Sequence, residues 1–110
     1  MKYEINSSDK ILDLKICSDI TTSNVDEIRL DTLEIINSDN LTDENWNFVD
    51  IDLLDANVID SSGLNFLVTL NRHVMKLGKK VRIYISSPHI HRTFLYVRMD
   101  KKMEIILKDN

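Results

Sequence analysis

The sequence predicts an α/β domain in which a mixed, partly parallel sheet is covered by helices. Short segments whose apolar residues alternate, as in half-buried strands, are separated by longer segments whose apolar residues have helical spacing. The chain of 110 residues has the size of one domain, and no repeat, low-complexity stretch or linker divides it. Its composition, 43% hydrophobic and 29% charged, is ordinary for a globular protein. We therefore expect a single domain over residues 1–110.

The first predicted elements are two strands. A short strand around Tyr3–Ile5 is followed by a turn through residues 6–9. The segment Leu12–Ile16 then alternates apolar and charged residues, which indicates a second, half-buried strand. Cys17, at the end of this strand, is expected in the core.

A helix and a third strand follow. The helix is predicted to begin at Ser23, because a hydroxyl followed three residues later by the carboxylate of Asp26 is typical of a helix start. Its apolar stripe comprises Val25, Ile28, Ile35 and Ile36. The helix ends near Asn37, and the apolar residues of Phe48–Leu53 then indicate a strand that leads into an acidic loop ending at Asp60.

The segment after Asp60 is predicted to form a largely buried helix with one exposed strip. At 100° per residue, the apolar side chains span a broad arc and the polar side chains fill the remainder. The apolar arc comprises Leu64, Phe66, Leu67, Val68, Leu70, Val74, Met75 and Leu77. The exposed strip comprises Asn65, Thr69, Arg72, His73 and Lys76. Gly78 is expected to end the helix in the left-handed conformation.

The last part of the chain predicts a strand, a helix and a short final element. The strand is Lys80–Ile85, and the helix begins with Ser87 as cap and Pro88 in the first turn. The inner side of this helix is expected to carry Ile90, Phe94 and Val97. The type of the final element, Glu104–Leu107, stays open between a strand and a helical turn.

Charge is distributed unevenly along the chain. Residues 1–62 contain 4 basic and 15 acidic residues, whereas residues 63–110 contain 10 basic and 3 acidic residues. One interpretation is that the two parts fold against each other and partly neutralise; the other is an anionic partner for the basic part. Nucleic acid is not the expected partner, because the sequence lacks the aromatic and basic stripe that stacks bases.

Several kinds of site are not expected. Gly63 and Gly78 are the only glycines, too few for the loops that cradle nucleotide phosphates, so no cofactor is expected. His91 follows His89 by two positions, so on a helix their side chains point about 200° apart. This geometry disfavours a metal ion shared by the two histidines. With one cysteine, no signal peptide and no apolar run of ~20 residues, we expect a cytoplasmic protein without a membrane partner.

The segment Asp60-Ser61-Ser62-Gly63 stands where a loop passes into a helix. One interpretation is ordinary capping, because aspartate and serine accept hydrogen bonds from free backbone N–H groups. The other is phosphorylation of an exposed hydroxyl, because the helix dipole and the free N–H groups tolerate a phosphate at this end. A serine hydrolase is disfavoured, since its nucleophile requires a Gly-x-Ser-x-Gly elbow and a histidine within reach.

An ordered set of motifs extends over most of the chain. The set comprises Asp19-Ile20, Asp52 eight residues ahead of Asp60, Ile59–Leu64, Gly78–Ile83, Ser87-Pro88, Phe94 and Asp100–Ile105. Together, from about Lys10 to Ile106, these motifs resemble the STAS domain, the fold of the bacterial anti-sigma-factor antagonists. The resemblance implies a sheet of four or five strands with helices packed on one side.

The resemblance also implies a function without catalysis. It makes Ser61 the phosphoacceptor, with Ser62 as second choice. It implies that an anti-sigma factor serine kinase phosphorylates this serine, that a PP2C-type phosphatase resets it, and that the unphosphorylated antagonist binds the kinase and frees the sigma factor. The expected partner-binding residues are Asp19, Asp60, Ser61, Ser62, Gly63, Asn65, Thr69, Arg72 and Lys76.

A second function is compatible with the same resemblance. The chain would then be a constitutive STAS interaction subunit of a stress-signalling assembly or of a transporter ATPase. Asn65 stands where the family usually has glycine, and because it lies on the predicted exposed strip, it is expected to alter docking rather than folding. The intact Ser61-Ser62 pair favours the phosphorylation-switched antagonist.

Overall fold

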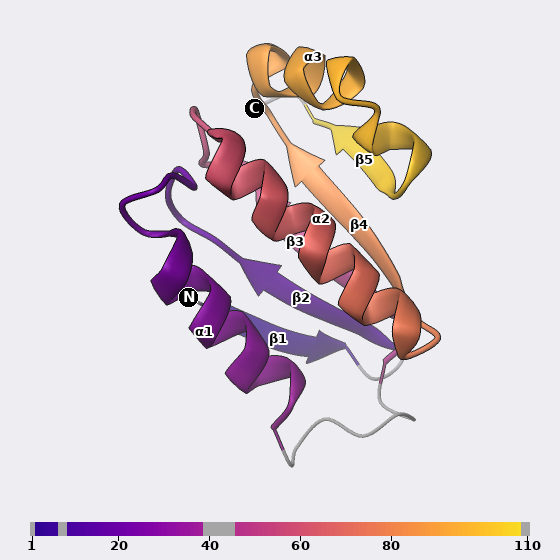
Figure 1. Cartoon of the computed structure of the whole chain (residues 1–110). Coiled ribbons are helices and arrows are strands. Elements are labelled where there is room, and N and C mark those ends of the chain that lie inside the picture. The colour runs from indigo at the N-terminus through magenta and orange to yellow at the C-terminus, as the bar shows by residue number, and fades with distance from the viewer. Residues whose placement is uncertain (1, 7–8, 39–45, 109–110) are drawn as a thin grey trace.

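The computed structural model describes residues 2–6, 9–38 and 46–108. Its described part consists of one five-stranded sheet, three α-helices and a short 3-10 helix (Figure 1). The strands are β1 (Lys2–Asn6), β2 (Ile11–Lys15), β3 (Phe48–Leu53), β4 (Lys80–Ile85) and β5 (Glu104–Leu107). The helices are α1 (Val25–Ile36), α2 (Ser61–Lys76), α3 (Pro88–Tyr96) and the 3-10 helix η1 (Met99–Lys101).

The strands lie in the order β1-β2-β3-β4-β5. β1 is antiparallel to β2 and the remaining neighbours are parallel, so the predicted mixed sheet is confirmed. Crossovers between parallel strands are right-handed. Because each strand after β1 is added on the same side of the one before it, these crossovers place the connecting helices on one face of the sheet. In Figure 1, α1 and α2 lie side by side over one face of the sheet, and the predicted one-sided cover is confirmed.

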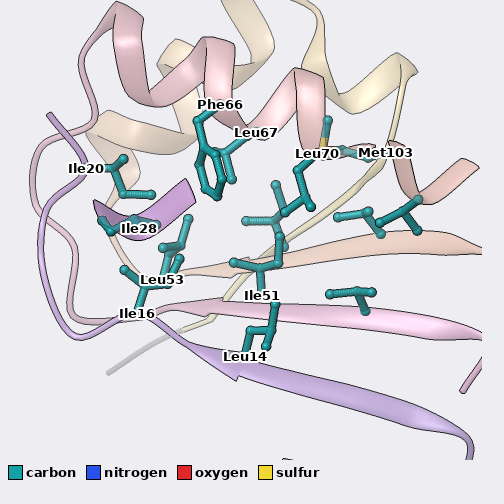
Figure 2. Close-up of a cluster of buried hydrophobic side chains, with 14 of the residues drawn as sticks. Leu14, Ile16, Ile20, Ile28, Ile51, Leu53, Phe66, Leu67, Leu70 and Met103 are labelled. Atoms are coloured by element: carbon teal, nitrogen blue, oxygen red, sulfur yellow. The ribbon is translucent and has the colours of Figure 1, made fainter. Parts of the chain in front are cut away.

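The core lies between the sheet and its helices. The strands contribute Leu12, Leu14, Val49, Ile51, Leu53, Val81, Ile83 and Ile85, all buried. Across from them, α1 contributes Ile28, and α2 contributes Phe66, Leu67 and Leu70 (Figure 2). Ile90 and Phe94 of α3 belong to the same cluster, which therefore joins the helices to the sheet in one body.

The other face of the sheet carries polar side chains. Asp50 on β3 is only 7% exposed and accepts hydrogen bonds from Arg82 Nε (2.6 Å), Arg82 Nη2 (3.0 Å) and the Tyr84 hydroxyl (3.2 Å). The Arg82 guanidinium also lies 4.3 Å from the centroid of the Phe48 ring. A buried carboxylate is tolerated when a paired, hydrogen-bonded cation compensates it, and Arg82 provides that compensation.

Four residues expected in the core are exposed instead. Cys17 is exposed because alternation along the extended chain turns Ile16 inward and its neighbour outward. Met75 is 59% exposed because it lies about 100° round the helix from buried Val74. The other two, Leu77 and Val97, follow the last residue of α2 and α3 respectively and are not part of the buried helical faces.

The predicted start of the first helix is also corrected. Asn24, not Ser23, is the cap residue of α1, and it makes no side-chain capping bond. Its side chain instead holds the preceding turn, accepting from the Thr21 amide at 2.9 Å and donating to the Asp19 carbonyl at 2.8 Å. The Ser23 hydroxyl lies 2.8 Å from Thr21 Oγ1, so it is engaged within the turn.

Two other helix predictions are confirmed, and one choice that the sequence left open is resolved. Gly78 has a φ of 77°, the left-handed conformation that ends α2. Ser87 Oγ accepts a hydrogen bond of 3.2 Å from the Ile90 amide at the start of α3. The open choice for Glu104–Leu107 is resolved as a strand, because it pairs in parallel with β4.

The buried face of α2 yields a stability prediction. Replacing Leu67 or Val74, both completely buried, with Asp should unfold the domain, because an unpaired buried carboxylate costs more than about 3 kcal/mol. Thr69→Ala and Lys76→Ala, at exposed positions of the same helix, should change stability by less than about 0.5 kcal/mol. Thermal unfolding followed by circular dichroism measures all four. Similar melting temperatures would show that the inner face of α2 is assigned wrongly.

Candidate functional site

The candidate site lies where the loops after β2 and β3 meet at the start of α2. Ile20 and Ile59 form an isolated parallel bridge, an extension of the sheet pairing beyond the strands. The Ile20 amide donates to the Val58 carbonyl at 3.1 Å, and the Asp60 amide donates to the Ile20 carbonyl at 3.2 Å. Main-chain bonds therefore fix the position of Asp60 relative to the loop after β2.

Asp19 strengthens the same junction. Its Oδ1 accepts hydrogen bonds from the backbone amides of Asn57 at 2.7 Å and Val58 at 3.0 Å. These amides belong to the loop before Asp60, 38 and 39 positions along the chain. Asp19 was expected among the partner-binding residues; in the structure its carboxylate joins the two loops.

Asp60 is the cap of α2 and a second tie between the loops. Its Oδ1 accepts from the Gly63 amide at 3.0 Å, and its Oδ2 accepts from the Thr22 amide at 2.9 Å and the Thr22 hydroxyl at 3.2 Å. These bonds favour the ionised carboxylate, and the pKa of Asp60 is lowered, chiefly by the Gly63 amide and then by the Thr22 amide. A negative charge is thus held at the start of α2.

The two serines of the motif have different surroundings. Ser62 Oγ lies 3.0 Å from Thr22 Oγ1, within hydrogen-bond distance. Ser61 is exposed at the first residue of α2, and its hydroxyl has no hydrogen bond within the described part of the chain. Ser61 therefore presents the freer hydroxyl.

Thr22 is the residue of this site that the sequence did not reveal. It contacts both Asp60 and Ser62 through its side chain, and the partners are 38 and 40 positions away. The sequence around a hydroxyl residue in a loop does not indicate which distant residues it contacts. Only the pairing of the two loops brings Thr22 to the start of α2.

Gly63 is required by a close approach of two backbone segments. A Cβ at this position would lie 2.6 Å from the Ile20 carbonyl oxygen and 2.8 Å from Ile59 Cγ2. Real Cβ atoms do not approach backbone oxygen this closely, so any larger residue must displace the first turn of α2 or the Ile20 segment. The glycine allows α2 to begin directly against the loop.

The remaining predicted site residues lie along the outer face of α2. Asn65, Thr69, Arg72 and Lys76 are all exposed, and at 100° per residue they line up with Ser61. At 1.5 Å per residue, Lys76 is roughly 22 Å from Ser61 along the helix axis. The structure therefore places the motif at one end of a long exposed strip, and Thr69 also borders the groove between α1 and α2.

Within the described residues, no three His, Cys, Asp or Glu side chains are grouped as a metal site would require. Neither does any helix in that part of the chain combine the length and apolar character needed to cross a membrane.

Substitution of Gly63 tests the backbone contact. Gly63→Ala should destabilise the protein by about 1–3 kcal/mol, because the added methyl group must push apart two backbone segments. Two-dimensional NMR should show amide shifts at Ile20, Thr22 and Asp60 as the junction moves. Ser61→Ala, an exposed change two residues away, is the matched control and should leave the Ile20 and Thr22 amides nearly unchanged. Equal stability of the two variants would contradict the close approach.

Comparison with known proteins identifies the fold of this chain. The family model described as "STAS domain" matches residues 2–108. No curated protein sequence matches the chain. Among solved structures, a Thermotoga maritima protein assigned as an anti-sigma factor antagonist has a TM-score of 0.77 and 17% identity, covering 97% of this chain and 86% of its own.

Two further structures share the fold at similar identity. The anti-sigma factor antagonist SpoIIAA, solved in its unphosphorylated form, has a TM-score of 0.61 and 12% identity, covering 99% of this chain and 89% of its own. The murine anion transporter Slc26a9 has a TM-score of 0.74 and 13% identity over 91% of this chain but only 16% of the transporter. Such low identities establish a common fold and nothing more. Because the family model matches nearly the whole length, the chain belongs to the STAS domain family.

Proposed function

We propose that this protein is an anti-sigma factor antagonist switched by phosphorylation of Ser61. The observation that carries the proposal is the exposed Ser61 hydroxyl, which has no hydrogen bond within the described residues and lies at the first residue of α2, next to ionised Asp60. Ser62 is the less favourable acceptor, because its hydroxyl lies 3.0 Å from that of Thr22. The similarity of the fold to solved antagonists supports the assignment.

A phosphate on Ser61 is compatible with the folded state. The start of a 16-residue helix carries the positive end of the helix dipole, which favours an anion. The close contact with the Ile20 backbone is made at Gly63, which lies about 200° round the helix from Ser61. Phosphorylation would therefore change the surface that a partner meets and leave the fold intact.

The switch would operate through docking of an anti-sigma factor that is also a serine kinase. The unphosphorylated chain binds this kinase through the outer face of α2 and frees the sigma factor. Phosphorylation adds about −1.5 to −2 charges beside Asp60, and a partner surface fitted to a neutral serine must then desolvate or repel the dianion. A PP2C-type phosphatase removes the phosphate and resets the cycle. The chain itself performs no catalysis and acts in the cytoplasm.

A second candidate function has support from one comparison. The fold is shared with part of an anion transporter, where a unit of this size is 16% of a longer chain. This chain would then be a constitutive interaction subunit, in a stress-signalling assembly or beside a transporter ATPase, and Ser61 would be only the first residue of a helix. Phosphopeptide mapping of protein from its own cells distinguishes the two, because a constitutive subunit carries no phosphate on Ser61.

Phosphorylation by the kinase is the first test. Incubation with labelled ATP should label the chain only when the kinase is present, and Ser61→Ala should abolish the label while Ser62→Ala should retain it. The reason is that the Ser61 hydroxyl is exposed, whereas the Ser62 hydroxyl is engaged with Thr22. Label that survives Ser61→Ala and disappears with Ser62→Ala would transfer the acceptor role to Ser62. Label without kinase would contradict the proposed lack of catalysis.

The effect on binding is the second test. A cost of ~3 kcal/mol for the phosphate would weaken binding about a hundredfold. Ser61→Asp should lose part of this affinity, because it adds one charge, and Ser61→Ala should bind as the unmodified chain does. Titration calorimetry against the kinase measures each variant, with Glu34→Gln, an exposed change in the last turn of α1, as a folded control away from the motif. Equal affinities of the Asp and Ala variants would mean that Ser61 is no switch.

A further inference from the structure

A groove runs between the C-terminal half of α2 and η1. Its volume is about 380 Å³, and it is lined by Val68, Asn71, Arg72, Met75, Lys101 and Lys102. We call it the basic groove, because three of these six residues are cations and none is an acid. It opens on the side of α2 away from the groove that α2 forms with α1, which has its own set of lining residues.

The cations of the basic groove are largely uncompensated. Arg72 and Lys102 make no ion pair or hydrogen bond through their side chains within the described residues, and Lys101 Nζ is 4.0 Å from the carboxylate of neighbouring Asp100. Elsewhere in the described residues, Arg82 of the basic part is paired with Asp50 of the acidic part.

The groove also has an apolar wall. Met75 is 59% exposed and Val68 is partly buried, so both offer apolar surface to a ligand. Between them, the Asn71 side-chain amide is already engaged, with the Lys102 carbonyl at 3.3 Å and Met75 Sδ at 3.5 Å. Cations along an apolar wall fit a ligand that combines carboxylates with at least one apolar side chain.

From this arrangement we infer that the basic groove binds an acidic segment of a protein partner, with an apolar side chain against Met75 and carboxylates on Arg72 and Lys102. Arg72 lies roughly 16 Å from Ser61 along α2, so one partner can cover both on the same helix face. The identity of the partner rests on the proposed function. If that function holds, the anti-sigma factor contributes the acidic segment.

Two other anionic partners fit less well. Single-stranded nucleic acid needs aromatic side chains for stacking, and the residues that line the groove include none. An anionic membrane is broad and would also face α1, whose acidic residues are Asp26, Glu27, Asp31 and Glu34, on a chain of net charge −4. A short acidic segment meets mainly the groove cations, because charges beyond the Debye length of about 8 Å are screened.

The test uses a synthetic peptide of three Glu-Glu-Leu repeats and the full chain. In an NMR titration, the amides that shift should cluster in residues 68–76 and 99–103. Arg72→Glu and Lys102→Glu should each weaken binding about five- to tenfold. Arg92→Glu, an equal charge change at an exposed residue of α3 that does not line the groove, should have a much smaller effect. A Glu-Glu-Gly peptide should bind more weakly, because it leaves Met75 uncovered.

Several outcomes would overturn the inference. Equal loss of peptide binding in all three charge variants would reduce the effect to net charge, and shifts spread over the whole surface would do the same. Stronger, Arg72-dependent binding to vesicles containing phosphatidylserine, or to a DNA oligonucleotide, would replace the protein segment by that partner. The proposed function is tested separately, because Ser61→Asp should leave peptide binding unchanged while it weakens binding of the kinase. If the peptide binds at the groove but Ser61→Asp does not weaken binding of the kinase, the groove proposal is retained and the switch proposal is rejected.

Discussion

The backbone of Ile20 and the first turn of α2 touch at Gly63, and the rest of the site is organised by this contact. A Cβ at Gly63 would lie 2.6 Å from the Ile20 carbonyl oxygen, so the approach is possible only for glycine. Around it, the Ile20–Ile59 bridge continues the sheet pairing, and Asp19 and Asp60 each accept hydrogen bonds from the opposite loop. The starts of α1 and α2 are thereby held together at one end of the domain.

The order of the strands gives α2 its particular position. Because parallel strands follow one another in sequence order, right-handed crossovers place the helices on one face, and α2 lies between α1 and β5 in Figure 1. Its inner face packs into the core through Phe66, Leu67 and Leu70 (Figure 2). On its outer face, the residues from Ser61 to Lys76 that line up along the helix are exposed within the described part of the chain. A modification at the first residue can therefore alter recognition without any need to move the core.

The charges of the chain are separated in space as well as in sequence. α1 carries four acidic residues and one arginine, whereas the charged residues of α2 are Arg72 and Lys76. Beside the C-terminal half of α2, Lys101 and Lys102 extend the cationic surface. A protein assigned as an antagonist and part of an anion transporter share this fold at low identity, so the architecture by itself does not identify a function.

The sequence by itself determined the elements that depend on local pattern. Alternation in Lys80–Ile85, the cap at Ser87 and the left-handed stop at Gly78 are each decided by neighbours within a few residues, and all three were predicted. The helix start after Asp60 was also predicted, because a helix start has its own sequence pattern.

The tertiary structure decided what depends on distant partners. Thr22 reaches Asp60 and Ser62 across 38 and 40 positions, and this separates an engaged Ser62 from a free Ser61. Cys17 and Met75 are apolar residues, yet both are exposed. Cys17 follows β2 on the outward side of the extended chain, and Met75 lies beyond the edge of the buried face of α2. The need for glycine at position 63 comes from a backbone oxygen 43 positions earlier in the chain. Local sequence pattern decides whether a segment forms a helix, a strand or a turn. Contacts between segments depend on how the segments pack together, which the sequence of one segment does not determine.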